Sequence, residues 1–269
     1  MKKNKEKVFA PDENPNDVVH VWHPLKFTIK ENYKFIRKGF FFNIFSFLLY
    51  CFCFLVLWPI NQLHYGLKVK GKKNLKGIKG AVVVSNHVLF NDYSTLFTHV
   101  FYPKHPYILA GHEGFKVPVA RHLIKLLKAV PTPVGSTPKT YAKFFRETCD
   151  MLSSGGKLIV FPEGSMFPFY NGLREFSSGA FKFSVKTGVP IVPIVTTYRK
   201  PSGIYKLFGR KKPLATINIL PKIDFVANEN LTNKENEQAL KEIVFNTMQA
   251  FFNENSTYSY TFVPKKKKQ

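Results

Sequence analysis

The stretch AVVVSNHVLFNDYS, residues 81–94, begins as a short apolar run and turns polar at its histidine. Its first part, Ala81–Ser85, is dominated by valine, and a β-branched run of this length predicts a buried β-strand. His87 lies just beyond the end of this strand, and Asp92 follows five positions later. Open α/β sheets gather their sites at the carboxyl ends of strands. The stretch therefore predicts a strand of such a sheet and, directly after it, a candidate site.

Short apolar runs recur along the rest of the chain and are separated by stretches of helical character. Alternating strands and helices favour an α/β fold, in which we expect a mixed sheet flanked by helices. No internal repeat or low-complexity linker divides this region, so one domain is expected. The runs that we expect to be strands, besides the first, are Lys157–Phe161, Ile191–Thr197 and Ala215–Leu220.

Two helices are predicted from their end signals as well as from their periodicity. The first is Lys139–Ser153, since Pro138 suits a first helical turn and Gly155 suits a helix end. The second follows Thr232 and Glu235, which have the spacing of a capping box. Apolar residues recur after them at helical intervals, which predicts an amphipathic helix closing the domain.

The charge of the chain limits its partners. Lysine and arginine number 40 against 17 aspartate and glutamate residues, a formal net charge of +23. Such a field favours polyanionic partners, either a nucleic acid or an anionic membrane surface. The three cysteines, at 51, 53 and 149, have no zinc-ligand spacing, so a disulfide framework is not expected and a reducing cytosol is the simpler compartment.

A long uncharged segment decides between these partners in favour of the membrane. Gly39–Ile60 reads GFFFNIFSFLLYCFCFLVLWPI, about the length needed to cross a bilayer core with roughly 20 helical residues. Lysines and arginines flank it on both sides, and basic flanks stay in the cytoplasm. We therefore expect a membrane-embedded segment that returns to the same side, with Pro59 as a place to bend or stop. The expected organisation is a basic segment over 1–38, a helical anchor over 39–66, the α/β domain over 67–254 and a basic tail over 255–269.

The His87–Asp92 pair has two interpretations from the residues alone. In the first, polar residues turn the chain after a strand, and Asp92 caps the next helix. In the second, a neutral imidazole takes a proton from an attacking hydroxyl, and a carboxylate on its other nitrogen fixes the tautomer. No G-x-S-x-G nucleophile motif is present, which favours direct attack by a substrate hydroxyl over an acyl-enzyme.

Four blocks of sequence, in order, resemble the glycerolipid acyltransferases that act on lysophosphatidic acid. SNHVLFND is similar to their H-x4-D motif, and the preceding VKGKKNLKGIKGAVVV is similar to the lead-in to that motif. LIVFPEGS resembles their Phe/Tyr-Pro-Glu-Gly-Thr-Arg signature, and SSGAFKFSVKTGVPIVPI resembles the helix and strand that follow it. The resemblance covers roughly residues 69–194, and it implies a catalytic role for His87 and Asp92.

The resemblance also implies an activity and its partners. The expected reaction moves a fatty acyl chain from acyl-CoA or acyl-acyl-carrier protein to the free hydroxyl of lysophosphatidic acid, giving phosphatidic acid in phospholipid biosynthesis. It implies no metal or redox cofactor and no nucleic acid. The lipid membrane is the expected partner, with the protein at the cell membrane and its catalytic domain on the cytoplasmic face. An apolar segment beside a basic domain suits a substrate with a lipid tail and an anionic head.

The sequence departs from the family pattern where the acceptor phosphate should bind. The family's Thr-Arg after Glu163 and Gly164 is replaced by Ser165 and Met166, and KAVPTPVGS also lacks the arginine usual in the middle block. Arg174 is the expected replacement, because guanidinium is a bidentate donor that methionine cannot supply. We expect substrate binding by Glu163, Gly164, Ser165 and Arg174, with backbone amides around Gly164 and Ser165 sharing the phosphate. His112 and Glu113 receive no role.

Three alternatives remain open from the sequence. The missing arginines leave room for an acyltransferase with a different lysolipid or a glycolipid as its acceptor. A membrane-tethered basic nucleic-acid-binding protein is an alternative from another class, although no DNA- or RNA-binding signature occurs in the chain. A non-catalytic lipid-binding relative is the third, and the intact His87 and Asp92 argue against it.

Overall fold

The computed structural model describes residues 29–111, 115 and 120–262, and the expected basic ends therefore fall partly outside the described residues. Within this part, seven strands form one sheet in the order β1-β7-β6-β2-β5-β3-β4. Every neighbouring pair is parallel except β6 and β7, which run antiparallel. The strands are β1 (Lys68–Lys70), β2 (Ala81–Ser85), β3 (Tyr107–Ala110), β4 (Ala129–Pro131), β5 (Lys157–Val160), β6 (Ile191–Arg199) and β7 (Leu214–Ile219).

The expected mixed α/β architecture is thus confirmed, and the four expected strands are β2, β5, β6 and β7. The helices are α1 (Phe40–Tyr65), α2 (Asp92–Leu96), α3 (Ala120–Leu126), α4 (Pro138–Ser153), α5 (Gly179–Thr187), α6 (Ile204–Leu207) and α7 (Asn233–Asn255), with a 3₁₀ turn η2 (Lys72–Leu75) and a π-helical turn η3 (Phe97–Phe101). Thr137 caps α4, and Thr232 with Glu235 forms the expected capping box of α7.

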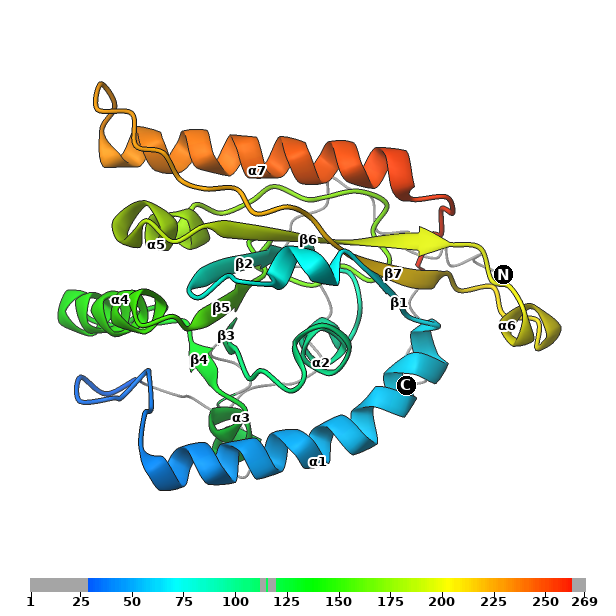
Figure 1. Cartoon of the computed structure of the whole chain (residues 1–269), viewed down its shortest axis with the longest axis horizontal. Helices are drawn as coiled ribbons and strands as arrows, with labels where there is room; N and C mark the ends of the chain where they lie inside the picture. The colour runs from blue at the N-terminus through cyan, green and yellow to red at the C-terminus, as the bar shows by residue number, and fades with distance from the viewer. Residues whose placement is uncertain (1–28, 112–114, 116–119, 263–269) are drawn as a thin grey trace, which may run out of the picture.

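The helices form two layers around the sheet (Figure 1). Helices α4, α5 and α7 pack on one face, where they contact β5, β2 and β6 respectively. On the other side α1 lies along α2, η3 and α3, and α2 sits between α1 and the sheet (Figure 1). The central strand β2 is completely buried, which places the loop that follows it in the middle of the molecule.

Segments at both ends of the described chain also pack on this domain. Phe35 is buried against the Phe144 ring, and the amides of Phe35 and Ile36 donate to the Glu147 carboxylate. After α7, the Tyr260 ring packs edge-on against Phe169. Both flanking segments therefore contact the α/β domain.

Helix α1 runs through Pro59, where the sequence offered a place to bend or stop, and does not stop there. It has 26 residues and curves along the domain (Figure 1). At 1.5 Å per residue its length is about 39 Å. Among the described residues it is the one helix long and apolar enough to cross a membrane.

Candidate active site

His87 and Asp92 meet at the end of the central strand. His87 follows β2 directly, Asp92 is the first residue of α2, and His87 Nδ1 lies 2.9 Å from Asp92 Oδ2. The imidazole stacks on the Phe161 ring, with centroids 4.4 Å apart and planes at 20°. Within the described part of the chain, Nε2 of His87 has no hydrogen-bond partner, and the residue lines a wide cavity. The free nitrogen is therefore the one that a substrate can reach.

The Asp92 carboxylate turns back toward the loop instead of capping its own helix. Its Oδ2 also accepts hydrogen bonds from the backbone amides of Val88 and Leu89, at 2.7 and 2.9 Å. Burial raises the pKa of Asp92, and the hydrogen bond from His87 and those two amides counter this rise. An oxygen that accepts three hydrogen bonds is arranged to stabilise negative charge. An ionised Asp92 accepts a hydrogen bond from Nδ1–H, which keeps the proton on Nδ1 and leaves Nε2 as the basic nitrogen.

Neighbouring strands hold the His87 loop rigidly. The Asn86 amide donates to Thr196 O at 3.1 Å and accepts from Thr196 N at 2.8 Å, which ties the end of β2 to β6. His87 O accepts from Phe167 N at 3.0 Å, and Val88 O accepts from Phe169 N at 2.8 Å, which ties the loop to the segment after β5. Sequence reasoning missed Asn86. The sequence signal available for it is its place directly after a valine-rich strand, and the structure shows that its side chain is fully buried.

Glu163 follows β5, the parallel neighbour of β2, so its carboxylate reaches the same end of the sheet. Its Oε2 lies 3.3 Å from Arg174 Nε and 3.5 Å from the amide nitrogen of His87. Burial raises the pKa of Glu163 to about 7, although the charges of Arg174 and His87 act in the opposite direction. Gly164, with φ of 75°, makes the turn after it, a conformation that side-chain-bearing residues rarely adopt.

Arg174 lies at the site but is occupied by protein partners. Besides Glu163, its guanidinium donates to Ser165 Oγ at 2.9 Å and to the carbonyl oxygen of Ser165. Three of its five N–H groups are thus used, and the other two have no hydrogen-bond partner among the described residues. The amides of Gly164 and Ser165, expected to help bind an anion, instead donate to Phe161 O and Glu163 O, at 3.1 and 2.9 Å.

A cavity of about 780 Å³ opens beside the His87 ring. Its walls come from α1, α2, η3, β3, α3, β4, α4, β5 and α5, and they are mostly apolar. A volume of this size falls in the range of small-molecule and lipid-tail sites. Lining residues include Leu57, Phe97, Leu109, Ile124, Leu127, Phe144, Ile159, Gly164, Ala180 and Phe183.

The acyltransferase family model matches residues 66–197, a range that contains His87, Asp92, Glu163 and Arg174. The chain belongs to the acyltransferase family. Its fold is similar to the crystal structure of the 1-acyl-sn-glycerophosphate acyltransferase PlsC from Thermotoga maritima, at 20% sequence identity and a TM-score of 0.51. That similarity covers 80% of this chain and 98% of the other.

Curated relatives of this acyltransferase chain are named as 1-acyl-sn-glycerol-3-phosphate acyltransferases. The chain is 29% identical over 141 residues to the chloroplastic protein of Arabidopsis thaliana and 30% identical over 142 residues to that of Brassica napus. These matches cover 51% of this chain and only 38% and 40% of the relatives' lengths. The protein of Borreliella burgdorferi is 25% identical over 182 residues, which is 65% of this chain and 70% of its own.

A polar network joins α1 to the first turn of α2 in this acyltransferase domain. Asn61 is fully buried, and its amide donates to Ser94 Oγ at 3.1 Å and to Thr98 Oγ1 at 3.3 Å. The Asn91 amide donates to Asn61 Oδ1, and Tyr65 OH donates to Asn91 Oδ1. Asn91 directly precedes Asp92, so the network ends one residue from the His–Asp pair. Sequence reasoning missed it because polar residues in so apolar a run carry no partner information.

Two further observations concern possible ligands. In residues 29–111, 115 and 120–262, no group of three His, Cys, Asp or Glu side chains is placed to hold a metal ion. His112 and Glu113, which received no role from the sequence, lie outside the described residues.

Proposed function

We propose that the protein is a membrane-associated glycerolipid acyltransferase. It transfers a fatty acyl chain from acyl-CoA or acyl-acyl-carrier protein to the free hydroxyl of lysophosphatidic acid, giving phosphatidic acid for phospholipid biosynthesis. The observation that carries the proposal is a histidine with a buried carboxylate on Nδ1 and a free Nε2 at a large apolar cavity. The names of the curated relatives support the same acceptor.

The mechanism follows from the two nitrogens of His87. Nε2 takes the proton of the acceptor hydroxyl as its oxygen attacks the thioester carbonyl carbon. Asp92 holds the Nδ1 proton and stabilises the imidazolium that forms. The tetrahedral intermediate then expels the thiolate, which receives the proton from Nε2. The acyl chain has moved from sulfur to oxygen, and the enzyme returns to its starting state.

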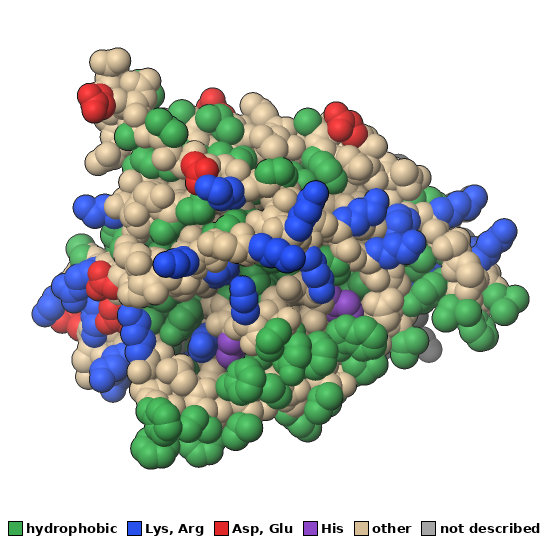
Figure 2. Space-filling model, in the orientation of Figure 1, with side chains coloured by type: hydrophobic (Ala, Val, Ile, Leu, Met, Phe, Trp, Pro, Cys, Tyr) green, Lys and Arg blue, Asp and Glu red, His purple; other side chains and the backbone are tan. Residues whose placement is uncertain are grey.

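The outward surface of α1 supports membrane association. The helix turns polar groups inward, since Ser46, Tyr50, Asn61 and Tyr65 are its buried residues. The apolar side chains gather on the opposite side, along the lower edge of the molecule in Figure 2. Those exposed to solvent are Phe40, Phe41, Ile44, Phe45, Phe47, Leu48, Phe52, Leu55, Val56, Trp58, Ile60 and Leu63. A helix held to a domain along its whole length lies in the plane of the membrane surface.

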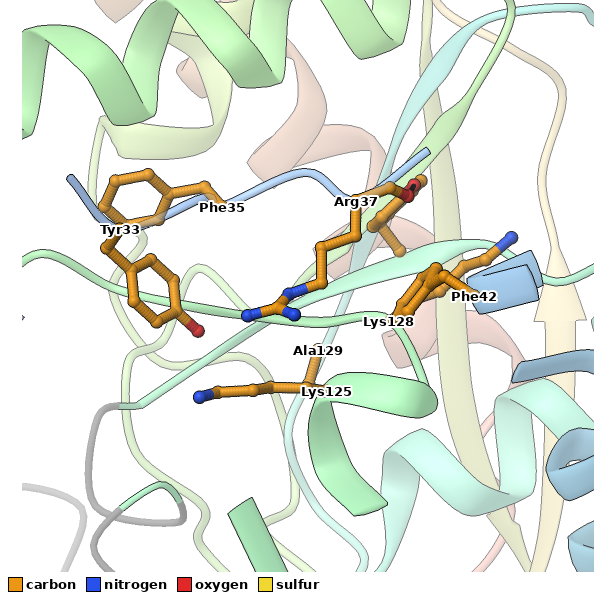
Figure 3. Close-up of a pocket in the computed structure, with 8 residues that line it drawn as sticks. Tyr33, Phe35, Arg37, Phe42, Lys125, Lys128 and Ala129 are labelled. Carbon is orange, nitrogen blue, oxygen red and sulfur yellow. Dashed lines mark hydrogen bonds between the residues drawn. The ribbon is translucent and has the colours of Figure 1, made fainter. Parts of the chain in front are cut away.

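The first turn of α1 lies beside a small basic pocket (Figure 3). Arg37 and Lys125 extend toward the Tyr33 hydroxyl, and Lys128 reaches the other way, toward α1. Burial lowers the pKa of Lys125, and the charges of Arg37 and Arg121 lower it further. In the part of the chain that the structure describes, Arg37, Lys125 and Lys128 form no ion pair with an acidic side chain, and cations at the edge of an apolar helix face suit the headgroup level of an anionic membrane.

We expect both ends of α1 to lie on the cytoplasmic side. The reason is that a helix lying in one leaflet exports neither of its basic flanks. Single cysteines near residues 30 and 75, in a background without native cysteine, can be labelled from outside intact cells with an impermeant maleimide. Both should label only after permeabilisation. Labelling of one position in intact cells would show that α1 crosses the membrane.

Arg174 is proposed to contact the acceptor phosphate with its two remaining N–H groups while its other bonds hold Glu163 and Ser165. Arg174→Ala should raise the KM for lysophosphatidic acid by about tenfold or more, since charged hydrogen bonds contribute roughly 1.5–3 kcal/mol each. Arg146→Ala, an exposed arginine on α4, is the matched control. If only kcat falls, and falls equally for a neutral acceptor, Arg174 holds the loop and does not bind phosphate.

The proposed acceptor is tested with purified enzyme, a labelled acyl thioester and a panel of acceptors. Lysophosphatidic acid should be preferred, and neutral lysolipids and glycolipids should react slowly. A preference for an uncharged acceptor would indicate that the absence of the family's arginine after Glu163 and Gly164 reflects a different acceptor. Failure of every acceptor to react would overturn the activity itself. Release from membranes by high salt alone would favour the nucleic-acid alternative, because counterion release does not free a buried apolar helix.

A further inference from the structure

The connection between β6 and β7 carries an exposed apolar tip that the active site does not use. It consists of α6 and Phe208, the next residue. Leu207 and Phe208 are 82% and 84% exposed, and Ile204 is also exposed, at 57%. Large apolar side chains that are this exposed and lie next to one another form a patch that is typical of a binding surface.

The tip is fastened to the carboxyl end of α1. Tyr205 OH donates to Gln62 O at 2.7 Å. Its ring lies against Gly66, where a Cβ atom would come within 3.0 Å of the ring. Arg199, at the end of β6, donates to Gly66 O at 2.6 Å. The apolar tip is therefore held at a fixed position relative to the apolar face of α1.

The connection that carries the tip is basic. The sequence from 200 to 223 contains no aspartate or glutamate. In Figure 2 the hydrophobic atoms over α6 form a cluster at the right-hand end, with blue side chains above it. The cations of this connection are Lys200, Lys206, Arg210, Lys211 and Lys212. Apolar side chains beside clustered cations match a bilayer with anionic headgroups. The apolar side chains can enter the acyl region while the cations contact the headgroups.

We propose that α6 and Phe208 form a second membrane-insertion point, the α6 tip, whose partner is an anionic lipid surface. It rests on the proposed placement of α1 in the membrane and adds a contact at the far end of that helix. Two contacts, one along α1 and one at the α6 tip, fix the rotation of the domain about the α1 axis. The occupant is a bilayer because the tip continues the apolar face of α1 and its charge complements anionic lipid.

The test measures depth in the membrane and does not depend on catalysis. Single cysteines replace Leu55 on α1, Phe208 at the tip, or Val226 between β7 and α7, in a background without native cysteine. Val226 is 83% exposed, which matches Phe208, and its connection lies on the α7 side in Figure 1. Each variant of the full chain carries an environment-sensitive fluorophore and is reconstituted in phosphatidylcholine–phosphatidylglycerol vesicles containing acyl-brominated lipid.

Fluorophores at 55 and 208 should be quenched by bromine and shielded from aqueous iodide, and the fluorophore at 226 should show the reverse. Iodide access at 208 equal to that at 226 would overturn the proposal. Shielding at 208 that is lost on dilution would also overturn it, by indicating a second copy of the chain as the partner. Absence of quenching at 55 would reject the placement of α1 instead, so the two failures are distinguishable.

Charge-reversal variants test the anionic part of the surface. The pair Lys206→Glu and Lys211→Glu should lower bromine quenching at 208 in phosphatidylglycerol vesicles toward the level in pure phosphatidylcholine. Lys234→Glu on α7 is the control and should change nothing. Leu207→Ser with Phe208→Ser should lower kcat/KM about tenfold for acceptor in vesicles and leave it unchanged in detergent micelles. If quenching at 208 depends neither on the lipid charge nor on the charges of Lys206 and Lys211, anionic lipid is not the partner.

Discussion

His87→Ala is expected to abolish acyl transfer, lowering kcat by about 10³-fold or more, because a general base alone contributes roughly 10²–10⁴-fold. The imidazole that takes the hydroxyl proton is then gone, and Asp92 has no partner to orient. The variant should stay folded and membrane-bound, since the ring contributes one stacking contact and its backbone bonds remain. The measurement is turnover of a labelled thioester with lysophosphatidic acid by the purified protein.

His122→Ala is the matched control for that experiment, because His122 is an exposed histidine on α3. It should retain the activity of the unchanged protein when it is purified and assayed in the same way. Near-normal turnover in purified His87→Ala enzyme would sink the general-base mechanism. Loss of activity together with loss of the cooperative unfolding transition would be a folding effect, which circular dichroism separates from a catalytic one.

Asp92→Asn is the second change with a large expected effect, a fall in kcat of about 10²–10⁴-fold. An amide is nearly the same size and can still accept from the amides of Val88 and Leu89, so the turn should survive. It carries no charge to stabilise the imidazolium that forms during the reaction. The KM for both substrates should change little, because Asp92 is buried behind His87.

Asp150→Asn, at an exposed position of α4, controls for the general effect of removing a carboxylate. The double variant His87→Ala with Asp92→Asn should be no slower than His87→Ala alone, since the two residues act as one unit. Additive losses would show that Asp92 acts independently of the histidine, and the pairing would then have another purpose.

The fold was predictable where local patterns are strong. The valine run of β2 and the capping box of α7 can be recognised from the sequence without an alignment. The strands β1, β3 and β4 are three or four residues long, too short for a period to emerge, and only their pairing in the sheet defines them. Strand order is likewise set by contacts between distant segments, which local preference does not encode.

The candidate site divides in the same way. His87 and Asp92 are five positions apart, so a strand–turn–helix brings them together from local geometry alone. The partners of Arg174 were not predictable, because its pairing with Glu163 depends on how the long loop after β5 folds back. Of the two outcomes expected at Pro59, a bend or a stop, the stop was wrong, because packing of α1 on the domain outweighs one missing amide hydrogen bond.

Helix α1 also supplies Tyr50 and Leu57 to the wall of the cavity beside His87, and Asn61 to the network beside Asp92. The helix is therefore part of the packed domain as well as an apolar surface, and it is not a separable membrane anchor. Removal of the residues before 67 would therefore open the cavity and leave buried side-chain amides without their hydrogen-bond partners, even if it raised the solubility. A water-soluble version calls for the opposite strategy. Every inward side chain of α1 is kept, and the exposed apolar residues of its outward face are replaced by polar residues.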